Sequence, residues 1–212
     1  MPTYRHKSTG KRFLFVHIPR TGGRFLESNL ELNGWECEQD NIWEFIDGIE
    51  IAHFDRELYE KHHDVKDIPH ISIIRNPIER FFSASIFLKR AYGDDIQEGS
   101  EDSLTFFSMI ENLPLPGASQ WWRPQSDFLS DKTHVWRFED GLGPAFSEWM
   151  SDKLGVPFKT DAFVEYSIGI DEGITKLDKT PKLIDNVRTL CKKDIEQLYP
   201  ELATPLQQGE KA

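Results

Sequence analysis

The stretch FLFVHIPRTGGRFLESNL, residues 13–30, decides the fold of this chain. Its first residues are apolar and β-favouring, which is typical of a strand buried on both faces. A Pro, a basic residue, a Thr and two glycines follow, and then an amphipathic run predicts a helix over 23–32. A strand that passes through a glycine-containing turn into a helix is the opening unit of a parallel α/β fold.

The rest of the chain repeats this alternation of strands and helices. Short apolar runs predict buried strands at 12–18, 49–53, 70–75 and 134–138. Helical spacing of apolar residues predicts helices at 23–32, 77–92, 142–154 and 183–198, with a short one at 55–58. The pattern indicates an α/β class: a P-loop-like three-layer fold with a central, mostly parallel sheet flanked by helices.

The length of 212 residues suits one domain over 1–212. We expect flexible ends at 1–11 and 203–212. An acidic surface loop is expected at 93–104, and a tryptophan-bearing loop that covers a site at 113–130.

The charge balance excludes some classes of partner. With 25 basic and 36 acidic residues, the formal net charge is −11 and the pI is near 5.1, which argues against nucleic acid and anionic membranes. Cys37 and Cys191 match no metal or redox spacing, so we expect reduced thiols. No apolar run approaches the roughly 20 residues of a membrane span, and no leader pattern is visible. We therefore expect a soluble, cytoplasmic protein.

The turn after the first strand has the chemistry of an anion site. Gly22 and Gly23 allow close approach of a ligand to the backbone, and the free N–H groups of a helix start favour a phosphate. Arg20 and Arg24 add positive charge, and Thr21 adds a hydroxyl. The spacing of an ordinary nucleotide-triphosphate loop is absent. The TGG triplet alone is equally consistent with a plain connection.

A second basic motif, ISIIRNPIERFFSASIF at 71–87, follows the third predicted strand. Arg75 ends the strand, and Ser83 lies two turns into the following helix. A planar guanidinium and a short hydroxyl together suit a phosphate. Taken alone, RNP is a common helix entry, and Arg80 could simply face solvent.

Together, HIPRTGGRF (17–25) and IIRNPIERFFSAS (73–85) resemble the 5′-phosphosulfate loop and the 3′-phosphate motif of sulfotransferases that use 3′-phosphoadenosine 5′-phosphosulfate. The likeness is greatest to the carbohydrate and heparan-type branch, and it continues through QWWRPQSDFL, HVWRFEDGLGPAFSEWM and LIDNVRTLCKKDIEQLYPEL to about residue 202. It implies transfer of a sulfuryl group to a hydroxyl, with the hydroxyl of a carbohydrate as the expected acceptor, without a metal. The implied donor-binding residues are Arg20, Thr21, Gly22, Gly23, Arg24, Phe25, Arg75 and Ser83.

The chain departs from the family pattern at two positions. Arg20 stands where the family usually has Lys, and Arg24 where it has Thr or Ser. Arg20 can stabilise the leaving oxygen electrostatically but is a poor proton donor. A donor-nucleotide-binding protein with lost or altered catalysis is therefore the second hypothesis. A P-loop nucleoside kinase is a third, and the missing Walker lysine argues against it.

A general base is expected at the carboxyl end of the second predicted strand, where His53 stands in IEIAHFDREL. Its imidazole titrates near neutral pH, as a base requires, and related sulfotransferases carry a His after their second strand. Taken alone, a His at a strand end is more often structural. His17 is expected to brace the donor loop, and no histidine has metal-ligand spacing with a partner.

The acceptor is expected to contact the QWWRPQ segment. Aromatic faces stack on sugar rings, and polar side chains bond hydroxyls. The candidate residues are Asp55, Trp121, Trp122, Arg123 and Gln125. Of the two tryptophans, we expect one to pack in the core. The lysine-bearing stretch 176–182 is either a solvated loop or a lid. The net charge predicts a neutral or lightly charged acceptor, so that heparin-like polymers are poor acceptors.

Overall fold

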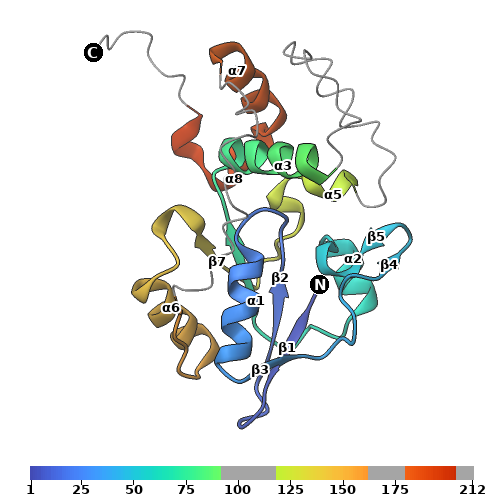
Figure 1. The fold of residues 1–212 in the computed structure, drawn as a ribbon, viewed down its shortest axis with the longest axis vertical. Coiled ribbons are helices and arrows are strands. Elements are labelled where there is room, and N and C mark those ends of the chain that lie inside the picture. Colours follow the sequence, from blue (N-terminus) through green and yellow to red (C-terminus); the bar gives the residue numbers. More distant parts are fainter. Residues whose placement is uncertain (92–117, 162–179, 204–212) are drawn as a thin grey trace.

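The computed structural model describes residues 1–91, 118–161 and 180–203. A five-stranded sheet in the order β3-β1-β2-β6-β7 lies among the helices (Figure 1). Its strands are β1 (Thr3–His6), β2 (Arg12–Val16), β3 (Trp35–Cys37), β6 (His70–Ile74) and β7 (Thr133–Arg137). A separate hairpin contains β4 (Phe45–Ile46) and β5 (Ile49–Glu50).

The helices follow the strands along the chain. The α-helices are α1 (Gly23–Leu32), α2 (Arg56–His62), α3 (Pro77–Ala91), α5 (Ala118–Trp122), α6 (Pro144–Leu154), α7 (Pro181–Leu190) and α8 (Lys192–Leu198). The short 3-10 helices are η1 (Ile51–His53), η3 (Gln125–Asp127), η4 (Phe138–Asp140) and η5 (Pro200–Leu202). Among the described residues, no helix is long and apolar enough to cross a membrane.

The predicted α/β class is confirmed. Strand β2 pairs in parallel with β6, and β6 pairs in parallel with β7. The segments that leave the carboxyl ends of these three strands therefore meet at one edge of the sheet, where ligands of such sheets bind.

Both faces of β2 are buried, which explains its unbroken apolar run. Phe13 and Phe15 belong to one core with residues of α1 and α6. Leu14 and Val16 point to the opposite face and join a second core that includes Tyr59 of α2. A smaller apolar cluster joins α3 to α7.

The expectation of a flexible N-terminal end at 1–11 is wrong. Strand β1 pairs antiparallel with both β2 and β3, so it lies inside the sheet. Buried Tyr4 and Trp35 alternate with exposed Arg5 and Glu36. This polar alternation belongs to a half-buried strand rather than to the fully buried type that the apolar runs indicate.

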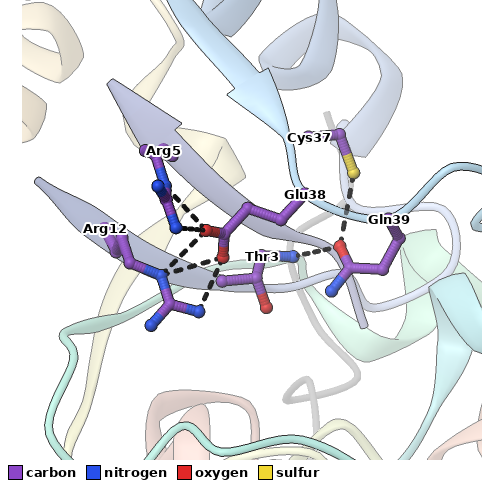
Figure 2. A network of polar contacts seen from close by, with 6 residues as sticks. All are labelled: Thr3, Arg5, Arg12, Cys37, Glu38 and Gln39. Carbon is purple, nitrogen blue, oxygen red and sulfur yellow. Dashed lines mark hydrogen bonds and ion pairs between the residues drawn. The ribbon is translucent and has the colours of Figure 1, made fainter. Parts of the chain in front are cut away.

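A polar network ties β3 to its neighbours (Figure 2). Glu38 accepts hydrogen bonds from Arg5 Nε at 2.9 Å and from Arg12 Nη2 at 2.7 Å. Gln39 Oε1 accepts from the Thr3 backbone N–H at 2.8 Å. Charged side chains thus fasten an edge strand that is only three residues long.

The expected strand at 49–53 is wrong in form and place. Only Ile49 and Glu50 are extended, and they pair with β4 outside the main sheet. Asp47 and Gly48 both have positive φ, 54° and 77°, as a tight hairpin of this type requires. The chain then turns into η1, so His53 lies on a 3-10 turn rather than at a strand end.

The expected helix at 183–198 is two helices, because α7 ends before Cys191 and α8 begins after it. The other helices predicted within the described residues are confirmed. The expected loop at 93–104, the first part of 113–130, the first part of 176–182 and most of the C-terminal end at 203–212 lie outside the described residues.

Candidate functional site

The donor loop, defined here as residues 17–24, joins β2 to α1. Arg20 and Gly22 both adopt left-handed backbone conformations, with φ of 67° and 98°. Thr21 is buried, and its Oγ1 donates a hydrogen bond to the carbonyl of Ile18 at 2.9 Å. No side chain caps the N-terminus of α1, and its first turn holds no acidic residue. These features fit an anion at the helix start.

The two glycines of the loop have a packing role that sequence reasoning did not supply. A Cβ on Gly22 would lie 3.1 Å from the Phe138 ring, and one on Gly23 would lie 1.9 Å from Nε2 of His17. Gly23 therefore leaves room for the buried His17 ring. His17 braces the loop as expected, by occupying this space.

Three distant segments meet beside the loop. Arg20 Nε donates to Ser83 Oγ of α3 at 3.1 Å. Arg75, directly after β6, donates from Nη1 to the Arg20 carbonyl at 3.3 Å, and its guanidinium lies 4.8 Å from the centre of the Phe138 ring. The structure thus places three of the candidate phosphate ligands at one corner of the sheet.

The Arg75 guanidinium is half-buried, and burial lowers its pKa. Among the described residues, no carboxylate lies within ion-pair distance of it. A desolvated cation of this kind gains most from a multiply charged anion, because the charge and the planar donor set are both used.

The remaining two donor-loop candidates lie on the first turn of α1. Arg24 is exposed, and its guanidinium lies 5.4 Å from the centre of the Trp43 ring. Phe25 is half-buried. Arg24 thus places positive charge between the donor loop and the segment that precedes β4.

His53 lies close to the donor loop despite the change in its secondary structure. Its side chain is 7% exposed, and Nδ1 lies 2.7 Å from Oε2 of Glu50. The ring centre is 5.0 Å from that of His17. The expectation that His53 titrates near neutral pH is wrong, because burial lowers its pKa to about 4 against the opposing effect of Glu50. The imidazole is therefore neutral at pH 7.

Two tryptophans flank the His53 ring. The ring centre of Trp43 is 6.0 Å from it, and that of Trp121 is 5.8 Å from it, both in edge-to-face geometry. Trp43 is 40% exposed, whereas Trp121 stacks on Phe87 at 4.8 Å. Trp122 packs instead on Phe81, in the cluster that joins α3 to α7.

Sequence reasoning missed Trp43 and Glu50. Glu50 falls inside the strand predicted at 49–53, where a single charged residue does not indicate a function. Trp43 precedes that strand and belongs to no recognised motif. The spacing of Glu50 and His53, three residues apart, was the available signal, because it brings two side chains together on a 3-10 turn.

Arg80 does not face solvent, contrary to the expectation from the sequence. It is buried, and its guanidinium donates to three carbonyls: Pro19 at 2.9 Å, Arg123 at 3.0 Å and Trp121 at 3.1 Å. One side chain of α3 therefore holds both the donor loop and the segment after α5. Burial lowers its pKa, but an arginine remains charged.

A buried carboxylate holds the same segment from the other side. Asp194 of α8 accepts from the backbone N–H groups of Gln125 at 2.8 Å and Ser126 at 3.0 Å. The Gln125 side chain is buried and bonds both the N–H and the carbonyl of Arg75. The expectation that Gln125 contacts the acceptor is therefore wrong, because its amide already holds the backbone after β6.

We expect Arg80→Met to lower the free energy of unfolding by about 3 kcal/mol, because three buried carbonyls lose their donor and Asp194 loses a nearby cation. Arg80→Lys, which keeps the charge but not the fork, should fall between this variant and wild type. Urea unfolding followed by tryptophan fluorescence measures both. The control is Arg56→Met, which removes an exposed ion pair with Glu60 and should change stability by less than about 1 kcal/mol. Equal losses for Arg80→Met and Arg56→Met would contradict the prediction.

The last two acceptor candidates form an ion pair. Arg123 Nη1 contacts Oδ2 of Asp55, whose Oδ1 accepts from the Leu58 N–H at 3.0 Å and caps α2. Both residues line an open hollow of about 510 Å³ that contains no donor-loop residue. Asp55 is only 4% exposed, whereas the Arg123 side chain is 36% exposed. Arg123 is therefore the member of this ion pair that an acceptor can reach. In the described part of the chain, no cluster of three or more His, Cys, Asp or Glu residues is arranged to hold a metal.

Comparison with known proteins gives one similarity. No family model matches the chain, and no curated protein matches it. Among solved structures, the fold is similar to a sulfotransferase from Alicyclobacillus acidocaldarius, with 18% sequence identity and a TM-score of 0.39. The match covers 71% of this chain and 60% of that chain. This is a loose likeness of fold, and the function proposed below is argued from the residues of the site.

Proposed function

We propose that the protein transfers a sulfuryl group from 3′-phosphoadenosine 5′-phosphosulfate to a hydroxyl of a carbohydrate. The observation that carries the proposal is the meeting of Arg20 with Arg75 and Ser83, which lie 55 and 63 positions later in the chain. Their convergence beside an uncapped helix start supports a ligand with two separate phosphate-like groups. The resemblance of the two sequence motifs points the same way.

The described residues fit such a donor. The N-terminus of α1, Arg20 and Arg24 would hold its 5′-phosphosulfate, and Arg75 with Ser83 would hold the 3′-phosphate. The left-handed backbone of Arg20 is uncommon for a residue with a side chain, and such conformations persist where a site requires them. It supports a loop built around a ligand.

The reaction requires positioning, charge stabilisation and a proton acceptor. The donor supplies a sulfuryl group on a phosphate leaving group; the acceptor oxygen bonds to sulfur as the bond from sulfur to the phosphate oxygen breaks. Arg20 would stabilise the charge that develops on that oxygen. His53, neutral and beside the loop, would take the hydroxyl proton on Nε2.

The acceptor would lie between the two tryptophans that flank His53. Trp43 offers an exposed aromatic surface, and aromatic surfaces of this kind suit the apolar face of a sugar ring. We propose a neutral or lightly charged acceptor, because the protein carries a net charge of −11 and repels a dense polyanion at long range.

The test is a comparison of nucleotides by thermal unfolding without magnesium. At about 100 times its dissociation constant, a ligand stabilises the fold by roughly 2.7 kcal/mol. Each kcal/mol raises the melting temperature of a chain of this size by about 2–4 °C. Adenosine 3′,5′-bisphosphate should therefore raise it by roughly 5–10 °C, and ADP or ATP should raise it much less.

Arg75→Ala should remove most of this preference, because only the Ser83 hydroxyl would then hold the 3′-phosphate and the other contacts are common to all three nucleotides. The matched control is Arg137→Ala: Arg137 ends the neighbouring strand β7 but is bonded to Glu201 and to the Leu198 carbonyl. That variant should keep the preference. Stabilisation by ATP with magnesium equal to that by the bisphosphate would favour the kinase alternative and overturn the proposal.

A further inference from the structure

We propose that Glu50 is the positioning residue for His53: its carboxylate holds a proton on Nδ1, so that Nε2 is the atom that accepts the substrate proton. This inference rests on the proposed function for its catalytic meaning. Its structural content, the tautomer of one histidine, is independent of any activity. The observation behind it is the distance of 2.7 Å between Nδ1 and Oε2 of Glu50, which is the length of a charge-assisted hydrogen bond.

Backbone hydrogen bonds hold the segment around Glu50. Glu50 ends a two-residue strand, β5, and pairs with Phe45 of β4 across a tight turn. The N–H groups of the next two residues, Ile51 and Ala52, donate to the carbonyls of Glu44 at 2.9 Å and Ile42 at 2.8 Å. Glu50 and His53 therefore belong to one hydrogen-bonded unit of hairpin and 3-10 turn.

The Glu50 carboxylate does not cap the 3-10 turn that follows it. Glu50 is the N-cap residue of η1, a position at which a side-chain oxygen can accept a backbone N–H of the following turn. No such bond is formed. The carboxylate contacts the imidazole of His53 instead, and its side chain keeps 25% exposure. The three-residue spacing on the 3-10 turn brings the two side chains to the same side, and the short contact between Nδ1 and Oε2 uses that proximity.

The nearby pair of His17 and Glu27 provides an internal comparison. Their atoms Nδ1 and Oε1 also form an ion-pair contact, but at 3.2 Å it is longer than the 2.7 Å contact between His53 and Glu50. His53 has the shorter contact, and no other hydrogen bond to its Nδ1 is formed within the described residues. In a neutral histidine, the partner of one ring nitrogen decides which nitrogen carries the proton.

The charges around His53 define the expected titration. Burial lowers its pKa most, Glu50 raises it, and His17 and the Met1 amine lower it further. Glu27 is coupled to both histidines and is the other carboxylate of this cluster. Removing the Glu50 charge should therefore lower the pKa of His53 below its value of about 4.

The experiment is nitrogen NMR of protein labelled in its histidines, with the His53 signals assigned by their loss in His53→Ala. Wild type should show a proton on Nδ1 and a bare Nε2 at neutral pH. Glu50→Ala should shift the population toward the other tautomer. It should also lower the turnover number by roughly 10- to 100-fold, as the loss of a group that orients a histidine does, with little change in the KM of the donor. Glu50→Gln, which keeps a hydrogen-bonding partner, should lie between Glu50→Ala and wild type.

The control is Glu44→Gln, which removes an exposed carboxylate from the same hairpin region and should change neither the spectrum nor the rate. A wild-type proton on Nε2, or an unchanged tautomer in Glu50→Ala, would overturn the inference. A Glu50→Gln loss as large as that of His53→Ala, with the tautomer unchanged, would identify Glu50 as the proton acceptor itself and would also overturn it. The expected spectra together with no sulfuryl transfer by wild type would support the tautomer and refute the proposed function.

Discussion

Replacement of His53 by alanine is expected to lower the turnover number by about two to four orders of magnitude, the range for loss of a general base. The binding of adenosine 3′,5′-bisphosphate should change little, because the base acts mainly in the transition state. Transfer of radiolabelled sulfate from the donor measures the first quantity, and the thermal shift measures the second. The control is His134→Ala, which removes an exposed imidazole from β7. Activity of His53→Ala within a few-fold of wild type would remove His53 from the mechanism.

The pH dependence gives a second check on His53. A base with a pKa of about 4 stays unprotonated well below the ordinary histidine value, so turnover should persist to about pH 5 before it falls.

The free energy of unfolding should also depend on pH over this range. The Met1 amine, His53, His63 and His70 all have lowered pKa values, so the unfolded chain binds protons first, beginning as the pH falls below about 8 and more steeply below about 6.5. Stability should therefore decrease from there toward pH 4, and near-UV circular dichroism at each pH separates unfolding from the loss of catalysis. An acid limb near pH 6.5 in folded protein would contradict the assignment.

Arg20→Ala is expected to lower the turnover number by about 10²- to 10³-fold, which is typical when one group that stabilises developing negative charge is removed. Arg20→Lys should keep or raise activity, because the charge rather than the planar fork is required at the leaving oxygen. The lysine also frees Ser83 from its bond to Arg20 Nε, and Ser83 then remains available to the 3′-phosphate. Initial rates with labelled donor measure both variants.

The outcomes for Arg20 also separate the two main hypotheses. Equal activity of wild type and Arg20→Ala would show that Arg20 has no part in the chemistry. If wild type binds the bisphosphate but transfers no sulfuryl group, and Arg20→Lys does transfer it, the chain is a donor-binding protein whose catalysis was lost at this position. Arg56→Ala, a change on the exposed face of α2, serves as the control for charge.

Local patterns were sufficient to predict much of this fold. Strands β2 and β6 are apolar runs because both their faces are buried, and that signal is legible without a structure. Strand β7 was also expected to be buried on both faces, but it lies at the edge of the sheet and its residues are half-buried or exposed. Strands β1 and β3 lack such runs, and their place in the sheet depends on pairing with β2. The prediction of a strand over residues 49–53 failed because a short apolar run is common to buried strands and to turns that pack on a core.

The residues of the candidate site also fall into two groups: those that local sequence patterns predict and those that only the tertiary structure reveals. Arg20, Arg75 and Ser83 each stand in a motif that names their chemistry, and the topology of a parallel sheet brings the ends of its strands together. The sequence by itself therefore determined the α/β class, the strand-turn-helix unit and the residues around the donor loop. These properties depend on periodicity and turn chemistry within a few residues.

Only the tertiary structure decided which side chains surround His53 and which are buried. Arg80 and Gln125 have no local signal of burial, and they are buried because the segment after α5 crosses α3 and the end of β6. Trp43 and Trp121, 78 positions apart in the numbering, flank one imidazole because the hairpin and α5 approach it from different directions. Such contacts depend on how complete elements pack. Packing is a property of the whole chain, and no window of the sequence contains it.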